Sequence, residues 1–271
     1  MVPSSQSFEA KELGAKQDRI TGKWAVDSDV FEREGRESFD KWLLLPKAAG
    51  EPTNHPPPNG DEGTIVFFDI ETTGLPAKGL KFGSFWDFKE LSKYESCRVV
   101  QISALTCKRS TLEVIETHDL VVRADNFLIP NHEFHGITLE RSMKEGIPFQ
   151  DAATRILGPL FKQADAIVAH NAAFDTNVLK SELFRYGLVD CLGTMERKPV
   201  ICSMLQTQSI VKAPSKHNPR IVKPPSLKEL YQFATGKSEM ANAHNSLYDV
   251  INLHEAVKAL VANNKFSFEA L

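Results

Sequence analysis

The chain has 271 residues with a formal net charge of −3, and 42% of the residues are hydrophobic and 25% charged, which is ordinary for a globular protein with room for one large domain or two small ones. This composition excludes a global basic field that would attract a polyanion, and no stretch approaches the roughly 20 apolar residues of a membrane span. The four cysteines have no C-x-x-C spacing, which argues against a disulfide framework or a zinc site and favours reduced residues in or near the core.

Residues 1–60 are polar and mixed in charge, and they lead into the Pro- and Gly-rich run "PKAAGEPTNHPPPNGDEG". Such a run is typical of a linker, so we expect a largely irregular N-terminal extension with one helix in residues 29–45. Its role stays open between binding a protein partner and keeping the chain soluble. The first residues lack an apolar signal segment and carry acids, so we expect an intracellular protein, in the cytoplasm or nucleus, without membrane contact.

Residues 65–75 read "IVFFDIETTGL", an apolar run of β-branched and aromatic residues that predicts a buried strand closed by Gly74. Side chains two positions apart on a strand point the same way, so Asp69 and Glu71 emerge side by side. Like charges about 4 Å apart repel by about 4 kcal/mol at an effective dielectric constant of about 20. A proton, an arginine or a metal ion must therefore compensate.

The rest of the chain alternates strand-like and helical segments. "CRVVQISALTC" and "LEVIETHDLVV" predict an antiparallel meander with the first strand. "FQDAATRILGPLFKQA" predicts a helix, "AIVAH" a short buried strand, and "AAFDTNVLKSELFRYG" a helix closed by Gly187. Two more helices follow a proline-rich segment, in "SLKELYQFATG" and "NSLYDVINLHEAVKALVANN". This order predicts an α/β domain over residues 61–265, with a mixed central β-sheet flanked by helices, and a C-terminal tail over residues 266–271.

Two more acids lie on the apolar faces of predicted helices. Val178 and Leu179 follow Asp175 by three and four residues, so Asp175 shares the face that meets the core. Asp249 begins an apolar stripe that continues at positions i+4, i+7, i+8 and i+11. A single such acid is usually a capping group near the helix N-terminus. Four inward-leaning acids on three elements instead predict, if they converge, an oxygen cage for a hard divalent cation, Mg²⁺ or Mn²⁺.

His244 precedes Asp249 by five residues, which is about 140° round a helix axis, so the two cannot share a helical face. If His244 works with the acids, it must lie in the turn before the helix, with Asn245 or Ser246 as the cap. A loop histidine without a role is the open alternative.

Three motifs in chain order, "DIETTGL", "HNAAFD" and "HNSLYD", resemble those of the DEDDh 3′-to-5′ exonucleases, the superfamily of the proofreading subunit of bacterial replicative polymerases. The segments "RVVQIS", "HGIT" and "CSM" are also similar to connecting segments of that family, and the resemblance covers about residues 64–262. The sister group has Tyr-x3-Asp in its third motif, and Asn245 stands at the tyrosine position. The histidine subtype is therefore favoured.

The resemblance implies an RNase H-like fold with two divalent cations, Mg²⁺ or Mn²⁺. The implied ligands are Asp69, Glu71, Asp175 and Asp249. Two cations about 3.5 to 4 Å apart can activate the attacking water and neutralise the leaving 3′ oxygen. His244 would be the general base, since an unperturbed imidazole titrates near about pH 6.5. The products would be nucleoside 5′-monophosphates released from a free 3′ end.

The family pattern also implies contacts with the terminal nucleotides. The residues expected to make them are Thr72, Thr73, Gly74, Leu75, Ile137, Asn171, Phe174 and His244. Leu75 and Ile137 would stack on the last bases, with core packing as the alternative. The basic run "KAPSKHNPRIVK" would grip phosphates or be merely solvated. The aromatic run "FGSFWDF" would anchor its loop in the core, which is favoured, or serve as a stacking platform.

The substrate stays open between single-stranded or frayed 3′ ends of DNA and of RNA, because sugar discrimination depends on contacts to one 2′-hydroxyl. DNA, in proofreading or repair, is slightly favoured because the matching segments look like those of proofreading-type proteins. A catalytically silent nucleic-acid-binding module on the same fold is the alternative class, although no motif acid is missing.

Overall fold

The computed structural model describes residues 63–81, 83–216, 218–240 and 245–268, and the backbone of Lys16–Gln17 and Trp24–Ala25. The chain divides into two compact units, Met1–Thr53 and Asn54–Leu271. In the first unit, β1 (Lys16–Gln17) pairs antiparallel with β2 (Trp24–Ala25). The helix expected in residues 29–45 lies outside the described residues.

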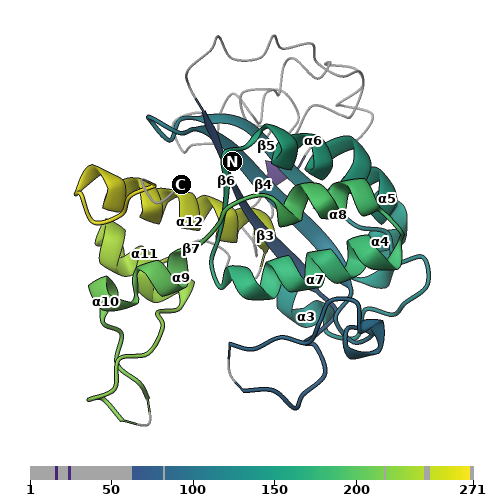
Figure 1. The fold of residues 1–271 in the computed structure, drawn as a ribbon, viewed down its shortest axis with the longest axis horizontal. Helices are drawn as coiled ribbons and strands as arrows, with labels where there is room; N and C mark the ends of the chain where they lie inside the picture. Colours follow the sequence, from purple (N-terminus) through teal and green to yellow (C-terminus); the bar gives the residue numbers. More distant parts are fainter. Residues whose placement is uncertain are drawn as a thin grey trace. The chain divides into compact units, whose positions relative to one another are not determined.

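The second unit is built on a five-stranded sheet with the strand order β5-β4-β3-β6-β7 (Figure 1). Its strands are β3 (Thr64–Thr72), β4 (Val99–Lys108), β5 (Val114–Val121), β6 (Ala166–Ala169) and β7 (Val200–Cys202). β3, β4 and β5 form the predicted antiparallel meander, whereas β3, β6 and β7 run parallel to one another. The predicted mixed sheet is therefore confirmed, with β3 at its centre.

Helices flank this sheet, as predicted (Figure 1). Those before β7 are η3 (Leu91–Lys93), α3 (His132–His135), α4 (Leu139–Glu145), α5 (Phe149–Asp151), η4 (Ala152–Leu157), α6 (Gly158–Gln163), α7 (Ala172–Arg185) and α8 (Val189–Glu196). Those after β7 are α9 (Ser203–Gln206), α10 (Gln208–Val211), α11 (Leu227–Thr235) and α12 (Ser246–Ala262). Within the described ranges, none of these helices has the length and apolar character needed to cross a membrane.

The helix predicted in residues 149–164 has a wider turn in its middle. α5 and α6 are α-helical, but η4 between them is a π-helix. Pro159 lies at the start of α6 and has no N–H group, so it cannot donate the regular hydrogen bond to the preceding turn. A wider turn accommodates the missing bond, which explains the departure from a single regular helix.

The two faces of β3 belong to two separate cores. Val66, Phe68 and Ile70 pack in a core that includes residues of α6, α7 and α8. Ile65 and Phe67 point the other way and pack with α11 and α12. Because side chains alternate along a strand, Asp69 and Glu71 continue the line of Ile65 and Phe67 on the α12 face. The strand therefore directs both acids toward α12.

The C-terminal segment is part of the second core, which corrects the expectation of a tail over residues 266–271. Phe266 and Phe268 are 5% and 8% exposed, and their ring centroids lie 5.4 Å apart. Both rings pack with the residues of α11 and α12. Two phenylalanines in so short a segment are too few to define a pattern, so the sequence did not predict their burial. The folded domain extends at least to Phe268.

The loop after β3 is anchored in the core by its aromatic residues, as favoured from the sequence. The Trp86 indole N–H donates to the carbonyl oxygen of Ala77 at 2.7 Å. Trp86 and Phe88 pack against the core beneath the sheet. Phe82 lies outside the described residues. The cysteines are free, with Cys97 and Cys107 buried and the other two half-buried, as expected of reduced residues.

Candidate active site

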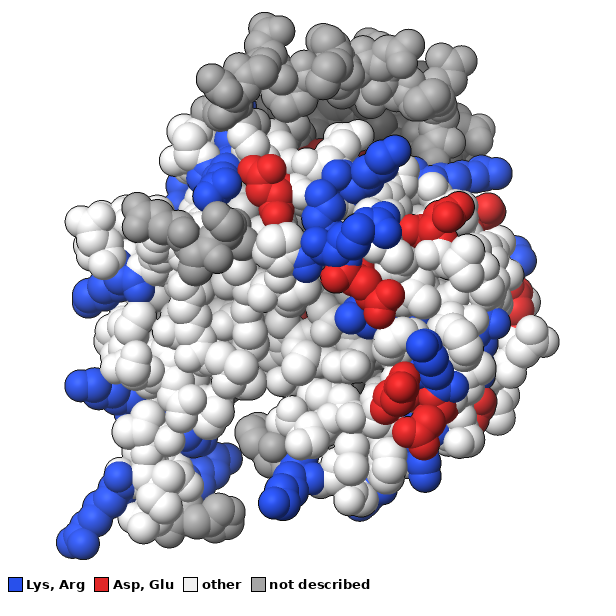
Figure 2. Space-filling model, in the orientation of Figure 1, with Lys and Arg blue, Asp and Glu red and all other residues white. Residues whose placement is uncertain are grey.

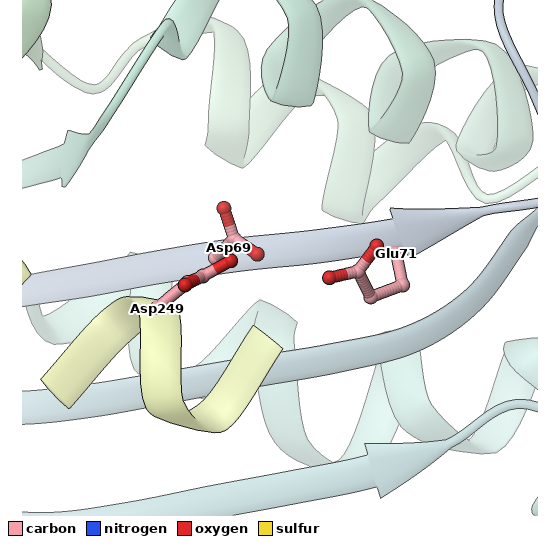
Figure 3. Close-up of side chains that lie close together, drawn as sticks. All are labelled: Asp69, Glu71 and Asp249. Carbon is pink, nitrogen blue, oxygen red and sulfur yellow. The ribbon is translucent and has the colours of Figure 1, made fainter. Parts of the chain in front are cut away.

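Three carboxylates meet where β3 faces the first turn of α12 (Figure 3). Asp69, Glu71 and Asp249 each offer an oxygen atom, and these atoms all lie within 4.8 Å of one another. Asp69 and Glu71 come from one face of β3, and Asp249 comes from α12. These three residues are called the acid cluster below. The structure thus brings together acids that are far apart in the sequence.

A pair of serines fixes the first turn of α12 next to Asp69. Ser103 lies opposite Asp69 in the register of β3 and β4, and its hydroxyl lies 2.7 Å from that of Ser246, the first residue of α12. Both serines are fully buried. Asn245, one of the two predicted caps, accepts a backbone N–H of the first helical turn with its side chain. Because the helix is anchored at its first residue, Asp249 is held close to the acids of β3.

Asp175 approaches β3 from α7. β6 pairs with β3 only as far as Phe67, so the edge of β3 beyond that residue is not covered by a strand. The Asp175 carboxylate is 2% exposed and accepts hydrogen bonds from the backbone N–H of Ile70 and from its own backbone N–H. Among the described residues, Asp175 does not join the group of oxygens that lie within 4.8 Å of one another. Three of the four acids that were predicted to converge therefore have oxygens within 4.8 Å of one another.

Burial and mutual repulsion raise the pKa values of these acids. The pKa of Asp69 is raised well above its ordinary value, first by burial and then by the charges of the other three acids. Burial, followed by the charge of Asp249, raises the pKa of Glu71 to about 7. Burial raises the pKa of Asp175 to about 8, although the two backbone hydrogen bonds oppose the shift. The repulsion predicted between Asp69 and Glu71 is therefore shared by four acids.

The donor set fits divalent cations. Within the described part of the chain, no lysine or arginine lowers the pKa of Asp69, Glu71 or Asp175. No arginine among the described residues therefore compensates these acids, which favours the other two expected groups, protons and metal ions. Carboxylate oxygens are the ligands preferred by hard cations such as Mg²⁺ and Mn²⁺. Cations also relieve the repulsion above the raised pKa values, where protons are lost.

The turn after β3 is held closely against the loop before β4. The Thr72 hydroxyl donates to the carbonyl oxygen of Gly74 at 2.7 Å, and the buried Thr73 hydroxyl donates to that of Ser96 at 3.1 Å. A Cβ on Gly74 would lie 2.8 Å from the carbonyl oxygen of Ser96, so a larger residue would force the backbone apart. Leu75 then points outward and is 71% exposed.

A groove of about 510 Å³, called the terminal groove below, opens beside this turn. Its other wall is the loop after β5, and its lining includes Thr73, Gly74, Leu75, Phe127, Leu128, Pro130 and Asn131. The Asn131 side-chain amide donates to the carbonyl oxygen of Thr73 at 3.0 Å and ties the two walls together. Leu128 is 75% exposed, as open as Leu75. An apolar groove of this size can take a flat ring such as a nucleobase.

Ile137, for which a base contact and core packing were the alternatives, packs in the core in this structure. Ile137 is 0% exposed and lies in a small core cluster with Val100, Ala124 and Ile129. Gly136 ends α3 with a φ of 72°, which turns the chain so that the next side chain enters the core. The exposed apolar side chain of this segment is instead Phe134, which is 63% exposed.

Asn171 and Phe174 begin α7, next to Asp175. Asn171 has a φ of 64°, in the left-handed region that asparagine tolerates better than most residues, and its side chain does not cap the helix. The half-buried Phe174 ring packs against Phe85, with 6.4 Å between ring centroids. Substrate contacts of both residues remain predictions.

His244, the predicted general base, lies outside the described residues. It directly precedes Asn245, the observed cap of α12. Its position beside the acid cluster therefore remains a prediction.

Sequence reasoning missed the residues that hold the acids in place. Ser103 and Ser246 carry no recognisable pattern, since buried serines in a strand and at a helix start are common. Arg98 precedes β4, and its buried guanidinium forms an ion pair with Glu182 of α7. The arginine that opens "RVVQIS", directly before an apolar run, is the one signal in the sequence that points to a buried ion pair.

The mixed sheet, with carboxylates on its central strand and on the helices beside it, defines the RNase H-like exonuclease class. The exonuclease family model RNase T matches residues 66–257, so the chain belongs to this exonuclease family. The resemblance drawn from the three motifs is thereby confirmed. No curated protein matches the chain.

Solved structures of exonuclease I have a similar fold. E. coli exonuclease I in complex with a dT13 oligonucleotide has a TM-score of 0.55 and 20% identity, covering 73% of this chain and 41% of that enzyme. The zinc-bound form of the E. coli ExoI–ssDNA complex has a TM-score of 0.55 and 20% identity, covering 74% and 41%. Exonuclease I from Methylocaldum szegediense has a TM-score of 0.54 and 19% identity, covering 74% and 40%. The chain spans about two fifths of the length of these enzymes.

Proposed function

We propose that the protein is a metal-dependent 3′-to-5′ exonuclease that hydrolyses phosphodiester bonds at free 3′ ends and releases nucleoside 5′-monophosphates. The observation that carries this proposal is the acid cluster, with carboxylate oxygens within 4.8 Å of one another in a chain of the exonuclease family. Crowded, half-buried acids oppose folding, and such local conflicts occur mainly at functional sites. Binding the cations needed for phosphodiester hydrolysis would give these acids a function.

The acid cluster and Asp175 would hold the divalent cations. Bound there, two cations would supply an activated water and neutralise the charge that develops on the leaving 3′ oxygen. Asp69 and Glu71 would present their oxygens from a rigid strand, and Asp249 would close the site from α12. Asp175 would add a fourth carboxylate, oriented by the N–H of Ile70 and ionised when the cations are bound. Mg²⁺ and Mn²⁺ fit the all-carboxylate donor set best.

His244 would act as the general base, taking the proton of the attacking water. Its place in the chain directly before the cap of α12 supports this role, because Asp249 lies in the first turn of the same helix. An imidazole titrates close to neutral pH, as a general base should.

The terminal groove would hold the last bases of the strand. Leu75 and Leu128 present exposed apolar side chains on facing walls, and backbone groups of Thr72, Thr73 and Gly74 lie between the groove and the acid cluster along the chain. Asn171 and Phe174 would contact the terminal nucleotide from the start of α7. E. coli exonuclease I has been solved with a single-stranded DNA oligonucleotide, which supports DNA as the favoured substrate.

A 3′-to-5′ exoribonuclease is the second candidate, because the groove contacts do not distinguish the two sugars. A catalytically silent nucleic-acid-binding module is the third, and the presence of all four acids argues against it. We also propose that the protein works inside the cell and that residues 1–60 bind a protein partner or keep the chain soluble.

The test is the shortening of a 5′-labelled, single-stranded oligonucleotide by the purified full-length protein with Mg²⁺ or Mn²⁺. We expect a ladder of products that shorten from the 3′ end, and nucleoside 5′-monophosphates by chromatography. DNA, RNA, single-stranded and duplex substrates run in parallel determine the preference. Asp175→Asn should abolish the reaction with retained folding, and His244→Ala should slow it by about 10² to 10⁴. A wild-type protein that binds but never shortens any of these substrates would favour the silent module.

A further inference from the structure

Residues 212–216 and 218–223, called the basic arm below, form a hairpin-like projection between α10 and α11 (Figure 1). Pro214 and Val222 form an antiparallel bridge. The backbone N–H of Ser215 donates to the carbonyl oxygen of Ile221 at 2.9 Å, and that of Lys223 donates to Ala213 at 2.9 Å. These bonds tie the two sides of the arm together, so its cations project from a paired backbone rather than from an unpaired loop.

The charge of the basic arm is not balanced by nearby acids. The sequence contains no Asp or Glu between Glu196 and Glu229. Lys212, Lys216 and Arg220 are exposed, and none of the three forms an ion pair with a described residue. On the face drawn in Figure 2, the region of α10, α11 and the arm carries Lys and Arg side chains without Asp or Glu. Isolated surface cations on a hairpin attract a polyanion locally, although the whole chain is slightly acidic.

The base of the basic arm is bonded to the segment that leads into α7. Nε2 of His170 lies 3.0 Å from the carbonyl oxygen of Pro225, just after the arm, and Nδ1 lies 3.0 Å from the Ser203 hydroxyl. A carbonyl only accepts, so Nε2 carries the hydrogen and Nδ1 can accept from Ser203. Burial lowers the pKa of His170 to about 4, which keeps the ring neutral near pH 7. The next residue is Asn171, four positions before Asp175, so this bond links the segment that follows the arm to the start of α7.

We propose that the basic arm binds the phosphodiester backbone of the same strand whose 3′ end enters the acid cluster. This inference rests on the proposed function and adds an interaction surface to it. Lys212, Lys216 and Arg220 are exposed along the arm, and each can pair with one phosphate of a nucleic-acid strand. Lys223 is excluded from the phosphate contact, because its ammonium group already pairs with Glu229 at the start of α11. An acidic membrane surface is the other polyanion to be tested, and the bond from Pro225, just after the arm, to His170, just before α7, favours the nucleic acid.

The test compares two triple variants of the full-length protein that remove equal charge. The arm variant is Lys212→Gln, Lys216→Gln and Arg220→Gln. The control variant is Lys144→Gln, Arg155→Gln and Lys162→Gln, three exposed cations on α4, η4 and α6. Binding of a fluorescein-labelled single-stranded DNA is measured by anisotropy in EDTA over a range of salt concentrations. Each lost phosphate contact reduces the magnitude of the slope of log K against log salt by about 0.7 for a single strand. Because the arm variant lacks three cations, we expect the magnitude of its slope to be smaller than the wild-type value by about 2.

The control variant should keep the wild-type slope, and both variants should keep the wild-type thermal midpoint. Hydrolysis of thymidine 5′-p-nitrophenyl phosphate, which is too small to reach the arm, should be unchanged in both variants. An arm variant with the wild-type slope would overturn the proposal, as would equal losses in the two variants. Vesicles with phosphatidylserine are tested in parallel. Lost vesicle binding with an unchanged DNA slope would also overturn it, in favour of a membrane surface.

The salt dependence of DNA binding tests the role of the arm, whereas hydrolysis of the thymidine ester tests catalysis, so the two proposals can fail separately. A wild-type protein that hydrolyses neither substrate would contradict the exonuclease proposal, while the binding slopes would still decide the role of the arm.

Discussion

At the scale of single residues, the crowded site acids lower the stability of the folded protein when they are ionised. An acid whose pKa is raised in the folded state stabilises the fold fully only below its unfolded pKa, and this contribution is lost as the pH rises through the folded pKa. Unfolded acids titrate near about pH 4. With folded pKa values of about 7 for Glu71 and about 8 for Asp175, the loss spans about pH 4 to about pH 8. The metal-free protein should therefore be least stable, with respect to these groups, at slightly alkaline pH.

We expect Asp69→Asn to raise the thermal midpoint of the metal-free protein at about pH 8, and to reduce its loss of stability between about pH 5 and about pH 8. The amide keeps the size of the carboxylate but removes the charge that repels the other acids. Thermal and urea unfolding in EDTA at several pH values measure this. The same variant should have no exonuclease activity with Mg²⁺ or Mn²⁺.

Glu196→Gln, which neutralises an exposed acid of α8, serves as the control and should leave the pH dependence unchanged. Lower stability of metal-free Asp69→Asn at pH 8 would contradict the account of the site as a centre of charge repulsion.

At the scale of elements, Arg98 connects three parts of the site. Its backbone pairs with Thr73 in the turn after β3, with the N–H of Thr73 donating to the carbonyl oxygen of Arg98 at 2.9 Å. Its guanidinium forms a buried ion pair with Glu182 of α7, and a second hydrogen bond between them measures 3.2 Å. The guanidinium also lies over the ring of Phe127, 4.4 Å from the centroid, in the wall of the terminal groove. A buried pair of this kind sets the relative position of the strand, the helix and the groove.

We expect Arg98→Met to lower the free energy of unfolding by about 3 kcal/mol, because the buried Glu182 then keeps only its longer contact with Arg185, at 3.8 Å. Arg98→Met combined with Glu182→Met should recover most of that loss, since an apolar pair of similar volume replaces a charged one. Urea unfolding of the single and double variants forms the double-mutant cycle. A double variant as unstable as the single one would show that packing, rather than the unpaired charge, dominates.

At the scale of the whole molecule, the C-terminal residues complete one of the two cores. Phe266 and Phe268 lie in the apolar layer of α11 and α12, on the face of the sheet that also carries the acid cluster. Each ring removes a large apolar surface from water. The layer that presents Asp249 thus depends on residues that follow the last helix.

We expect Phe266→Ala and Phe268→Ala each to destabilise the protein by about 3 kcal/mol, near the lower end of the range for a buried phenylalanine. Urea unfolding measures the change. Ser267→Ala, at the exposed position between them, should change stability by less than about 0.5 kcal/mol. Wild-type stability in both phenylalanine variants would restore residues 266–271 to the status of a tail.

The local pattern of the chain was enough to predict the mixed sheet, the meander and the helices. It also directed Asp69 and Glu71 to one face of β3 and Asp175 to the buried face of α7. These features repeat with the period of the strand or helix, so residues two to four positions apart already define them. The wider turn at η4 was missed because the consequence of Pro159 was outweighed by helical spacing.

What the sequence by itself determined is therefore the set of acids, the elements that carry them and the family to which the chain belongs. Only the tertiary structure decided that Ser103 meets Ser246, that Ile137 is buried while Leu128 and Phe134 are exposed, and that His170 bonds to the segment after the basic arm. The physical reason is the range of the interactions. The hydrophobic period of a strand or helix depends on residues two to four positions apart. The contacts named above join segments far apart in the chain and depend on which surfaces the packed core leaves open.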